Sequence, residues 1–244
     1  MLEVVALLTT GFWLFMIYDC VQNERERNTW LWILILLNFP GAVIYFLTRK
    51  LPRMDVAVPK YFTRWTRSRE LWIAEADARN IGKAHQFIVL GNLLCDMGML
   101  ERAENAYQTA LEKEPNNTQA LWGASFVDIE NKKFDTAKQY LEKLLKLEPD
   151  FKYGDGSLAY AKTLVALQDW ETAKTHLEQH IKRWSHPEAS IMMATIHSQE
   201  GNAQKARQYL ENMLTRIRGA SYFHYKRNRY WVNKAEKLLK TLPK

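Results

Sequence analysis

The sequence predicts an all-α protein with an apolar helical hairpin at its N-terminal end and a stack of helix-turn-helix units behind it. Two observations support this. Residues 4–18 and 29–48 contain no charged side chain. Similar helical segments further on place alanines at positions 103, 137, 173 and 206, at intervals of 34, 36 and 33 residues. A period near 34 with a small residue at each helix crossing is typical of a helical solenoid.

The first 50 residues are predicted to form a hairpin that spans a membrane twice. A spanning helix needs about 20 mostly apolar residues. Residues 29–48 reach that length, whereas residues 4–18 reach it only if Met1 to Glu3 lie at the membrane interface. A cleaved signal peptide is the alternative for the first segment. However, a basic n-region is missing and "MIYDC" offers no small-residue cleavage site. The sequence therefore favours a retained anchor over residues 1–50.

Lysines and arginines beside the apolar segments predict the orientation of this anchor. The connecting loop holds Arg25 and Arg27, while seven lysines and arginines lie between residues 49 and 69. Such residues accumulate on the cytoplasmic side, so both termini are expected in the cytoplasm and the loop outside. Cys20 and Cys95 would then lie in different compartments, and no disulfide within the chain is expected.

The second apolar segment contains Pro40 and Gly41, where the missing proline donor predicts a kink. These residues and Tyr45 resemble the phospholipase D nuclease N-terminal family. Further matches flank the loop at Tyr18, Asp19, Trp30 and Trp32. The resemblance implies a membrane anchor of the kind attached to many different proteins, and a bacterial inner membrane as its location. It implies no catalysis, since no phospholipase D catalytic motif follows in the sequence.

Residues 84–219 are predicted to hold four repeats, with expected bounds at 84–117, 118–153, 154–186 and 187–219. The first unit resembles the tetratricopeptide repeat at the eight positions of that family's pattern, which are Phe87, Leu90, Gly91, Leu94, Ala103, Tyr107, Ala110 and Pro115. Later units depart from the pattern. Asp128 replaces an aromatic residue in the second, the third carries an extra "YGDGS", and the fourth lacks a closing proline. Degenerate terminal units are expected in a solenoid, because an end repeat faces water.

Basic segments flank the repeats. Residues 51–83 are expected to form a juxtamembrane segment and then a capping helix that packs through Ala74 and Ala78. Residues 220–244 are expected to form one basic amphipathic capping helix that packs through Ala235.

The resemblance also implies which residues bind a partner. In tetratricopeptide proteins the first helix of each repeat lines a concave groove. The family's inward positions include, in this chain, Ile88, Asn92, Trp122, Phe126, Leu158, Lys162 and Ile191. Of the clamp that co-chaperone members use for a peptide carboxylate only Asn92 is present, so that ligand is not expected. Trp122 and Phe126 lie one helical turn apart and are the expected anchors for an apolar or helical peptide. The alternative is that Trp122 packs against the N-terminal capping helix as part of the core.

Two basic patches offer further contacts. The first begins at the predicted membrane boundary and is expected to meet anionic lipid, although it also satisfies the rule for cytoplasmic flanks. It comprises Arg49, Lys50, Arg53, Lys60, Arg64 and Trp65. The second comprises Lys226, Arg227 and Arg229. It could serve lipid, nucleic acid or an acidic partner, or could simply be the solvated side of the capping helix.

No catalytic or metal site is predicted. His176 and His180 stand four apart on one helix, but Leu177 occupies the position where the metallopeptidase pattern has its glutamate. No third ligand is evident, so these histidines are interpreted as surface residues. The glycines of "YGDGS" are interpreted as an insertion between repeats, because a phosphate loop would need a lysine and a preceding strand.

The sequence thus predicts a membrane-anchored scaffold or adaptor, without a cofactor, that recruits a protein partner through its cytoplasmic solenoid. The alternative is binding to anionic lipid or nucleic acid through the basic segments. Nucleic acid is not the expected partner, because no recognised nucleic-acid module accompanies the basic residues. The oligomeric state and the identity of the partner are left open.

Overall fold

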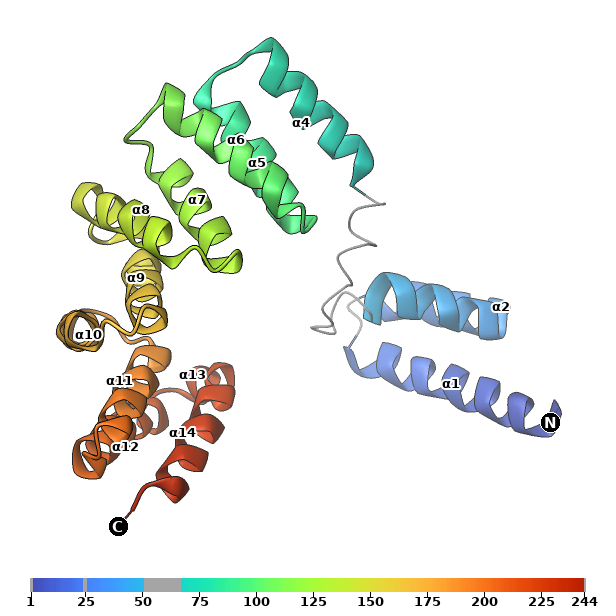
Figure 1. Ribbon diagram of the computed structural model, residues 1–244. Coiled ribbons are helices and arrows are strands. Elements are labelled where there is room, and N and C mark those ends of the chain that lie inside the picture. Colours follow the sequence, from blue (N-terminus) through green and yellow to red (C-terminus); the bar gives the residue numbers. More distant parts are fainter. Residues whose placement is uncertain (1, 24–25, 51–66, 244) are drawn as a thin grey trace. The chain divides into compact units, whose positions relative to one another are not determined.

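The computed structural model describes residues 2–23, 26–50 and 67–243, and all regular elements in these ranges are helices (Figure 1). The chain divides into two compact units, Met1–Pro59 and Lys60–Lys244. The first contains α1 (Leu2–Asn23), α2 (Arg27–Tyr45) and a π-helical turn, η1 (Phe46–Lys50).

Helix α2 is broken near its middle. Asn38 has φ 50° and ψ −125°, which no helix accommodates. Pro40 follows two residues later, and a proline lacks a backbone N–H and crowds the carbonyl four residues before it. The break therefore lies slightly before the predicted kink at Pro40 and Gly41, at an asparagine, a residue that tolerates positive φ better than most.

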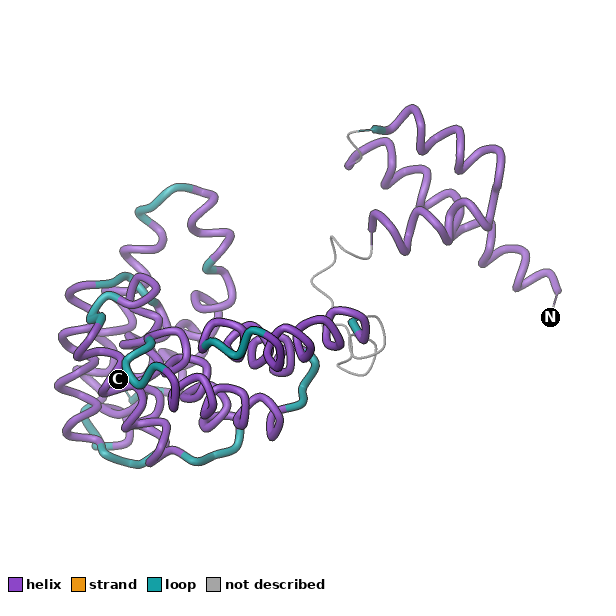
Figure 2. Tube along the Cα trace, turned by 90° about the horizontal axis from the view of Figure 1, so that it is seen from above, coloured by secondary structure: helices purple, strands orange, loops and turns teal. Residues whose placement is uncertain are grey.

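The two halves of α2 fold back on each other. Arg49 and Glu26, at opposite ends of the segment, form an ion pair with 3.0 Å between Nη2 and Oε2. The rings of Trp30 and Tyr45 are 5.5 Å apart. Figure 2 shows the tube reversing direction between the two grey stretches that flank this segment. A straight 24-residue helix would hold its ends about 35 Å apart, so residues 27–50 form a helix-turn-helix in their own right.

Polar groups gather at the end of this unit where α1 ends. The Lys50 ammonium lies 2.5 Å from the buried carboxylate of Asp19, which also accepts a 3.1 Å hydrogen bond from the Tyr45 hydroxyl. The unit also has an apolar core, which consists of Met16, Cys20, Leu34, Ala42 and Tyr45. Lys50, at the end of η1, is thus tied to α1.

Among the described helices, only the stretch Arg27–Lys50 is long and apolar enough to cross a membrane by length and composition. The prediction that residues 4–18 also span is not confirmed, and two spans remain a prediction.

The second unit is a stack of helix pairs that follow one another along a curve (Figure 1). After α4 (Ser68–Asn80), the pairs are α5 (Ala84–Asp96) with α6 (Leu100–Lys113), α7 (Thr118–Glu130) with α8 (Phe134–Leu147), α9 (Asp155–Ala166) with α10 (Trp170–Arg183), and α11 (Pro187–Gln199) with α12 (Ala203–Arg218). A short helix η3 (Phe151–Gly154) precedes α9.

Each pair turns at an equivalent position with positive φ. Gly98 (φ 70°) and Gly201 (φ 77°) serve the first and fourth pairs, and Lys132 (φ 59°) and Gln168 (φ 60°) serve the second and third. These residues lie five positions before Ala103, Ala206, Ala137 and Ala173, all of which are fully buried. The alanine repeat therefore marks both the crossing of the two helices and the turn between them.

Helices cap both ends of the stack. Helix α4 lies beside α5, and its Ala74 and Ala78 are buried. The expected single C-terminal helix is instead two, α13 (Tyr222–Arg227) and α14 (Arg229–Thr241). Asn228 separates them: its side-chain amide donates to the carbonyl of His224, a bond that competes with helical continuation. The inner face of α14 covers α12.

Candidate functional site

The predicted groove residues occupy the first helices of the four repeats, but not all are accessible. Ile88 on α5 and Ile191 on α11 are buried in the apolar core. They cannot offer a side chain to a ligand, because inter-repeat packing already covers them. Asn92, Phe126 and Lys162 are exposed.

Helix α7 carries the aromatic pair. Phe126 is 43% exposed, whereas Trp122, one turn earlier, is half-buried. The neighbour of Trp122 is Phe151 of η3, with ring centroids 5.4 Å apart, and not the N-terminal capping helix. Lys152 places its Nζ 5.1 Å from the centre of the Trp122 ring. Trp122 therefore joins the core on one side and meets a lysine on another.

Asn92 is held in place by the buried Tyr107, whose hydroxyl donates a 2.7 Å hydrogen bond to Asn92 Oδ1. The Tyr107 ring fits between two glycines. A Cβ on Gly91 would lie 2.7 Å from this ring, and one on Gly123 would lie 2.2 Å from it. Gly91 belongs to the pattern seen in the sequence. The role of Gly123 was missed, although a glycine inside a helix is itself a sign of close approach.

The remaining groove residues lie further along the stack. Leu158 on α9 is half-buried and packs against the core of the third and fourth repeats. The Lys162 ammonium forms a 2.8 Å ion pair with Glu188 at the start of α11. Lys162 is thus already partnered across two repeats, and a ligand carboxylate would compete with Glu188 for it.

The histidines of α10 form a polar network inside the third repeat. Ser157 Oγ lies 2.9 Å from both His176 Nε2 and His180 Nδ1, and His180 Nε2 lies 3.0 Å from His186 Nδ1. His180 is fully buried, so its interpretation as a surface residue is wrong. Burial, with smaller contributions from His186 and His176, lowers the pKa of His180 to about 4. Among the described residues no group of three or more His, Cys, Asp or Glu is placed to hold a metal ion.

The "YGDGS" insertion forms a strained turn. Lys152 (φ 47°) and Tyr153 (φ 55°) are consecutive residues in the left-handed region. Gly154 follows at φ 97°, where a Cβ would lie 2.6 Å from the Trp184 ring. Just before the insertion, Phe151 packs against Trp122, and within it Tyr153 is 89% exposed.

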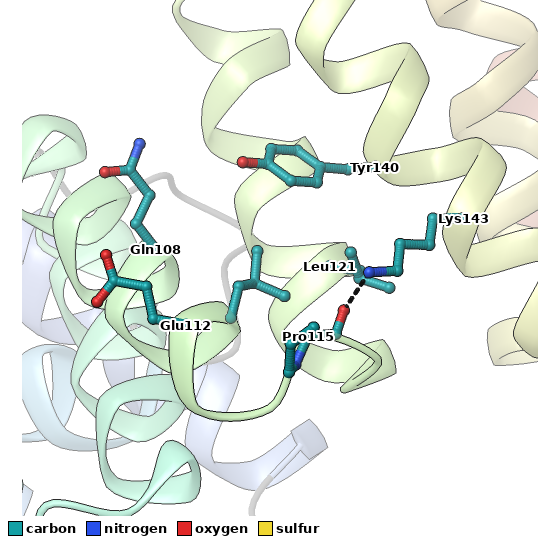
Figure 3. A pocket seen from close by; sticks show the side chains of 7 residues that line it. Gln108, Glu112, Pro115, Leu121, Tyr140 and Lys143 are labelled. Atoms are coloured by element: carbon teal, nitrogen blue, oxygen red, sulfur yellow. Dashed lines mark hydrogen bonds between the residues drawn. The ribbon is translucent and has the colours of Figure 1, made fainter.

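A hollow of about 380 Å³ lies between α6, α8 and the start of α7 (Figure 3). Lys143 reaches across it and donates a 2.6 Å hydrogen bond to the Pro115 carbonyl. Gln108, Glu112, Leu121 and Tyr140 line its walls. The second helices of the repeats form this hollow, so it is separate from the predicted groove, and the sequence did not single it out.

The two basic patches differ in what the structure describes. Arg49 pairs with Glu26 and Lys50 with Asp19, so both cations are already neutralised within the N-terminal unit. Arg53, Lys60, Arg64 and Trp65 lie outside the described residues. In the C-terminal patch Lys226 and Arg227 on α13 and Arg229 on α14 are exposed. Tyr222 and Phe223 beside them are also exposed.

Comparison with known proteins agrees with the helical repeat. Residues 94–151 and 128–183 match the family model "Tetratricopeptide repeat", and residues 11–50 match "Phospholipase D-nuclease N-terminal". No curated relative matches the chain.

Solved structures with a similar fold include YrrB, described as a TPR protein with an unusual peptide-binding site. It shares 24% identity over 68% of this chain and 92% of its own, with a TM-score of 0.52. MamA from Desulfovibrio magneticus RS-1 shares 14% identity over 66% of this chain and 90% of its own, with a TM-score of 0.59. TTC0263, a thermophilic TPR protein from Thermus thermophilus, shares 15% sequence identity over 70% of this chain and 89% of its own, with a TM-score of 0.51. The matches to the tetratricopeptide repeat model thus lie within the second unit, and the match to the phospholipase D-nuclease N-terminal model lies within the first.

Proposed function

We propose that this protein is a membrane-anchored adaptor whose repeats recruit a protein partner at the face formed by α7. The observation that carries the proposal is Phe126, a large apolar side chain left 43% exposed one turn from the half-buried Trp122. Exposed aromatic residues beside a packed support are the usual anchors of protein interfaces. The tetratricopeptide fold is a protein-interaction fold, and the peptide-binding site described for YrrB supports a peptide ligand by analogy.

The chemistry around these anchors favours an apolar or helical segment with a polar or acidic flank. The Asn92 amide oxygen accepts a hydrogen bond from the Tyr107 hydroxyl, so Asn92 offers its amide nitrogen to a ligand carbonyl. Lys152 lies over Trp122 and brings a positive charge beside the aromatic anchor. A ligand carboxylate next to an apolar side chain would use both features.

The test is capture of the partner by crosslinking from native membranes, with the full chain. Trp122→Ala combined with Phe126→Ala should abolish capture, at a cost of about 2 kcal/mol or more per anchor. Leu147→Ala is the matched control, because Leu147 is 45% exposed on the second helix of the same repeat. Capture that survives the double substitution in a folded protein would move the site elsewhere. If the double variant unfolds, both residues belong to the core.

Membrane anchoring is the second part of the proposal. Residues 11–50 match an N-terminal family whose resemblance implies a membrane segment, and the described helices carry many apolar side chains on their surfaces, among them Leu14, Phe15, Trp32, Ile35 and Leu36. The flanking lysines and arginines support a cytoplasmic position for the repeats, at the inner membrane. Salt-resistant recovery with membranes tests this, and release by salt alone would count against it.

A second candidate function is contact with an anionic surface through α13. Tyr222 and Phe223 are exposed beside Lys226, Arg227 and Arg229, and Glu236, the one carboxylate between residues 214 and 244, is paired with Arg218. Binding of this kind falls steeply with added salt, whereas binding at Phe126 and Trp122 should persist. Tyr222→Ser with Phe223→Ser would reduce only the salt-sensitive contact.

A further inference from the structure

The N-terminal unit is folded in a way that changes how it would sit in a bilayer. We propose that residues 27–50 do not cross the membrane but enter and leave it from the same face, as a re-entrant helical hairpin that binds one leaflet. The inference rests on the membrane anchoring proposed above. It goes beyond that anchoring by naming the side on which each end of the segment lies.

Contacts between the two ends carry the proposal. The ion pair between Arg49 and Glu26 and the edge contact between Trp30 and Tyr45 join residues that a straight helix would separate. Arg49 also places its guanidinium 5.3 Å from the centre of the Trp30 ring. Length and composition would let this stretch cross a membrane, but a segment whose two ends touch cannot deliver them to opposite faces.

The turn lies at the depth that a single leaflet allows. From Arg27 to the break at Asn38 the segment rises about 16 Å, roughly half of a hydrocarbon core about 30 Å thick. Phe39 at the turn packs against Phe12 near the middle of α1, with ring centroids 5.9 Å apart. Helix α1 continues past Phe12 towards Leu2, whereas the segment 27–50 turns back at this level.

The surface of the segment fits lipid. Trp32, Ile35, Leu36, Ile44 and Leu47 are exposed, while the polar groups are paired at one end of the unit. Unpaired charge in the apolar region would be costly. Here the ion pairs of Asp19 with Lys50 and of Glu26 with Arg49 lie together at the end that would face the headgroups.

The distribution of cations supports the same arrangement independently. In a two-span hairpin, Arg25 and Arg27 lie outside while seven lysines and arginines from residue 49 to residue 69 lie inside. If the segment is re-entrant, all nine of these lysines and arginines flank the cytoplasmic face of the membrane. Since lysine and arginine in short flanks determine orientation, the re-entrant arrangement satisfies the rule without exception.

The two arrangements differ in the side on which residue 28 lies. In the full chain, with Cys20→Ser and Cys95→Ser as background, Asn28→Cys and Tyr153→Cys would be labelled separately with a membrane-impermeant maleimide. Asn28 is exposed, and Tyr153 reports the side of the repeats. Both cysteines should react in inverted vesicles and neither in intact cells. Labelling of Asn28→Cys from outside, with Tyr153→Cys reacting only from inside, would overturn the inference and restore two spans.

A crosslinking measurement keeps the proposal testable if labelling at residue 28 is poor. Glu26→Cys combined with Arg49→Cys should be joined within one chain by a maleimide crosslinker with a reach of about 10 Å, because the fold-back brings residues 26 and 49 into contact. A straight helix would hold the two residues about 35 Å apart, beyond this reach. Absence of this product in membranes, with both cysteines reactive, would overturn the fold-back. Recovery of the chain in the soluble fraction would overturn the anchoring itself, a separate result from opposite-side labelling of a membrane-bound chain.

Discussion

Gly123 and Tyr107 illustrate, at the scale of single residues, how closely successive repeats approach. The buried Tyr107 ring of α6 lies against α5 and α7, and a Cβ on Gly123 would lie 2.2 Å from it. The same ring holds Asn92 through its hydroxyl. The packing of the repeats and the position of the exposed Asn92 are therefore coupled through one side chain.

Gly123→Ala should destabilise the protein by about 1–3 kcal/mol, because the added methyl overpacks a site that cannot expand. Thermal unfolding of the full chain measures this. Gln119→Ala, at an exposed position on the same helix, is the control and should leave the melting temperature nearly unchanged. Equal melting temperatures for both variants would mean that α5, α6 and α7 are not packed as described.

His180 should make stability sensitive to acid. Its pKa in the folded protein is about 4, below the ordinary value of 6.5, chiefly because it is buried. Between these values the unfolded chain binds more protons, so the free energy of unfolding falls as the pH drops from about 6.5 towards 4. The loss is expected to reach about 2–3 kcal/mol.

Denaturant unfolding between pH 7 and pH 4.5 checks this dependence. His180→Gln should flatten the slope of stability against pH, whatever its effect on stability itself. His85→Gln, at an exposed histidine on α5, should leave the slope unchanged. A slope that persists in the His180→Gln variant would assign the acid sensitivity to other groups.

At the scale of elements, much of the stack was predictable from the sequence and its irregularities were not. The alanine period correctly indicated the four helix pairs, because a crossing that tolerates only a small residue leaves a trace in the sequence. The turns at Lys132 and Gln168 left no such trace, since neither residue type is typical of positive φ. The break at Asn38 was expected only approximately, because its place depends on packing between the two halves of α2.

The groove was predictable only in outline, for a similar reason. The family positions lie on the first helices of the repeats, but Ile88 and Ile191 are covered by neighbouring repeats and Lys162 is paired with Glu188. The partner of Trp122, Phe151, lies two residues before the "YGDGS" insertion, which the family pattern lacks. Burial and pairing depend on contacts between repeats, which one repeat's pattern does not contain.

Helix α14 should stabilise the end of the stack through its inner face. Val232 and Ala235 are buried against α12. Val232→Ala removes buried apolar surface and should cost about 2 kcal/mol. Asn233→Ala, at the exposed neighbouring position, should cost little. If thermal unfolding shows no difference between them, α14 does not cap the repeats.

At the scale of the whole molecule, the chain consists of two units with their own cores, Met1–Pro59 and Lys60–Lys244. Each repeat buries its apolar face on its neighbours and needs no lipid to do so. The apolar exterior of the first unit and the charged exterior of the second therefore suit different surroundings.

Deleting residues 1–50 should release a folded, helical and soluble fragment. Circular dichroism and membrane fractionation of this fragment test the division, with the full chain as the reference. A fragment that aggregates, or that remains with membranes in high salt, would show that the repeats depend on the N-terminal unit.

Recruitment of a partner at α7 can be tested by site-specific photo-crosslinking. A benzophenone amino acid would replace Phe126 in one full-length variant and Leu147 in another, since both positions are similarly exposed but lie on different helices of one repeat. We expect a discrete crosslinked product in native membranes from position 126 and none from position 147. Products of equal yield at both positions, or a product from position 147 alone, would contradict it.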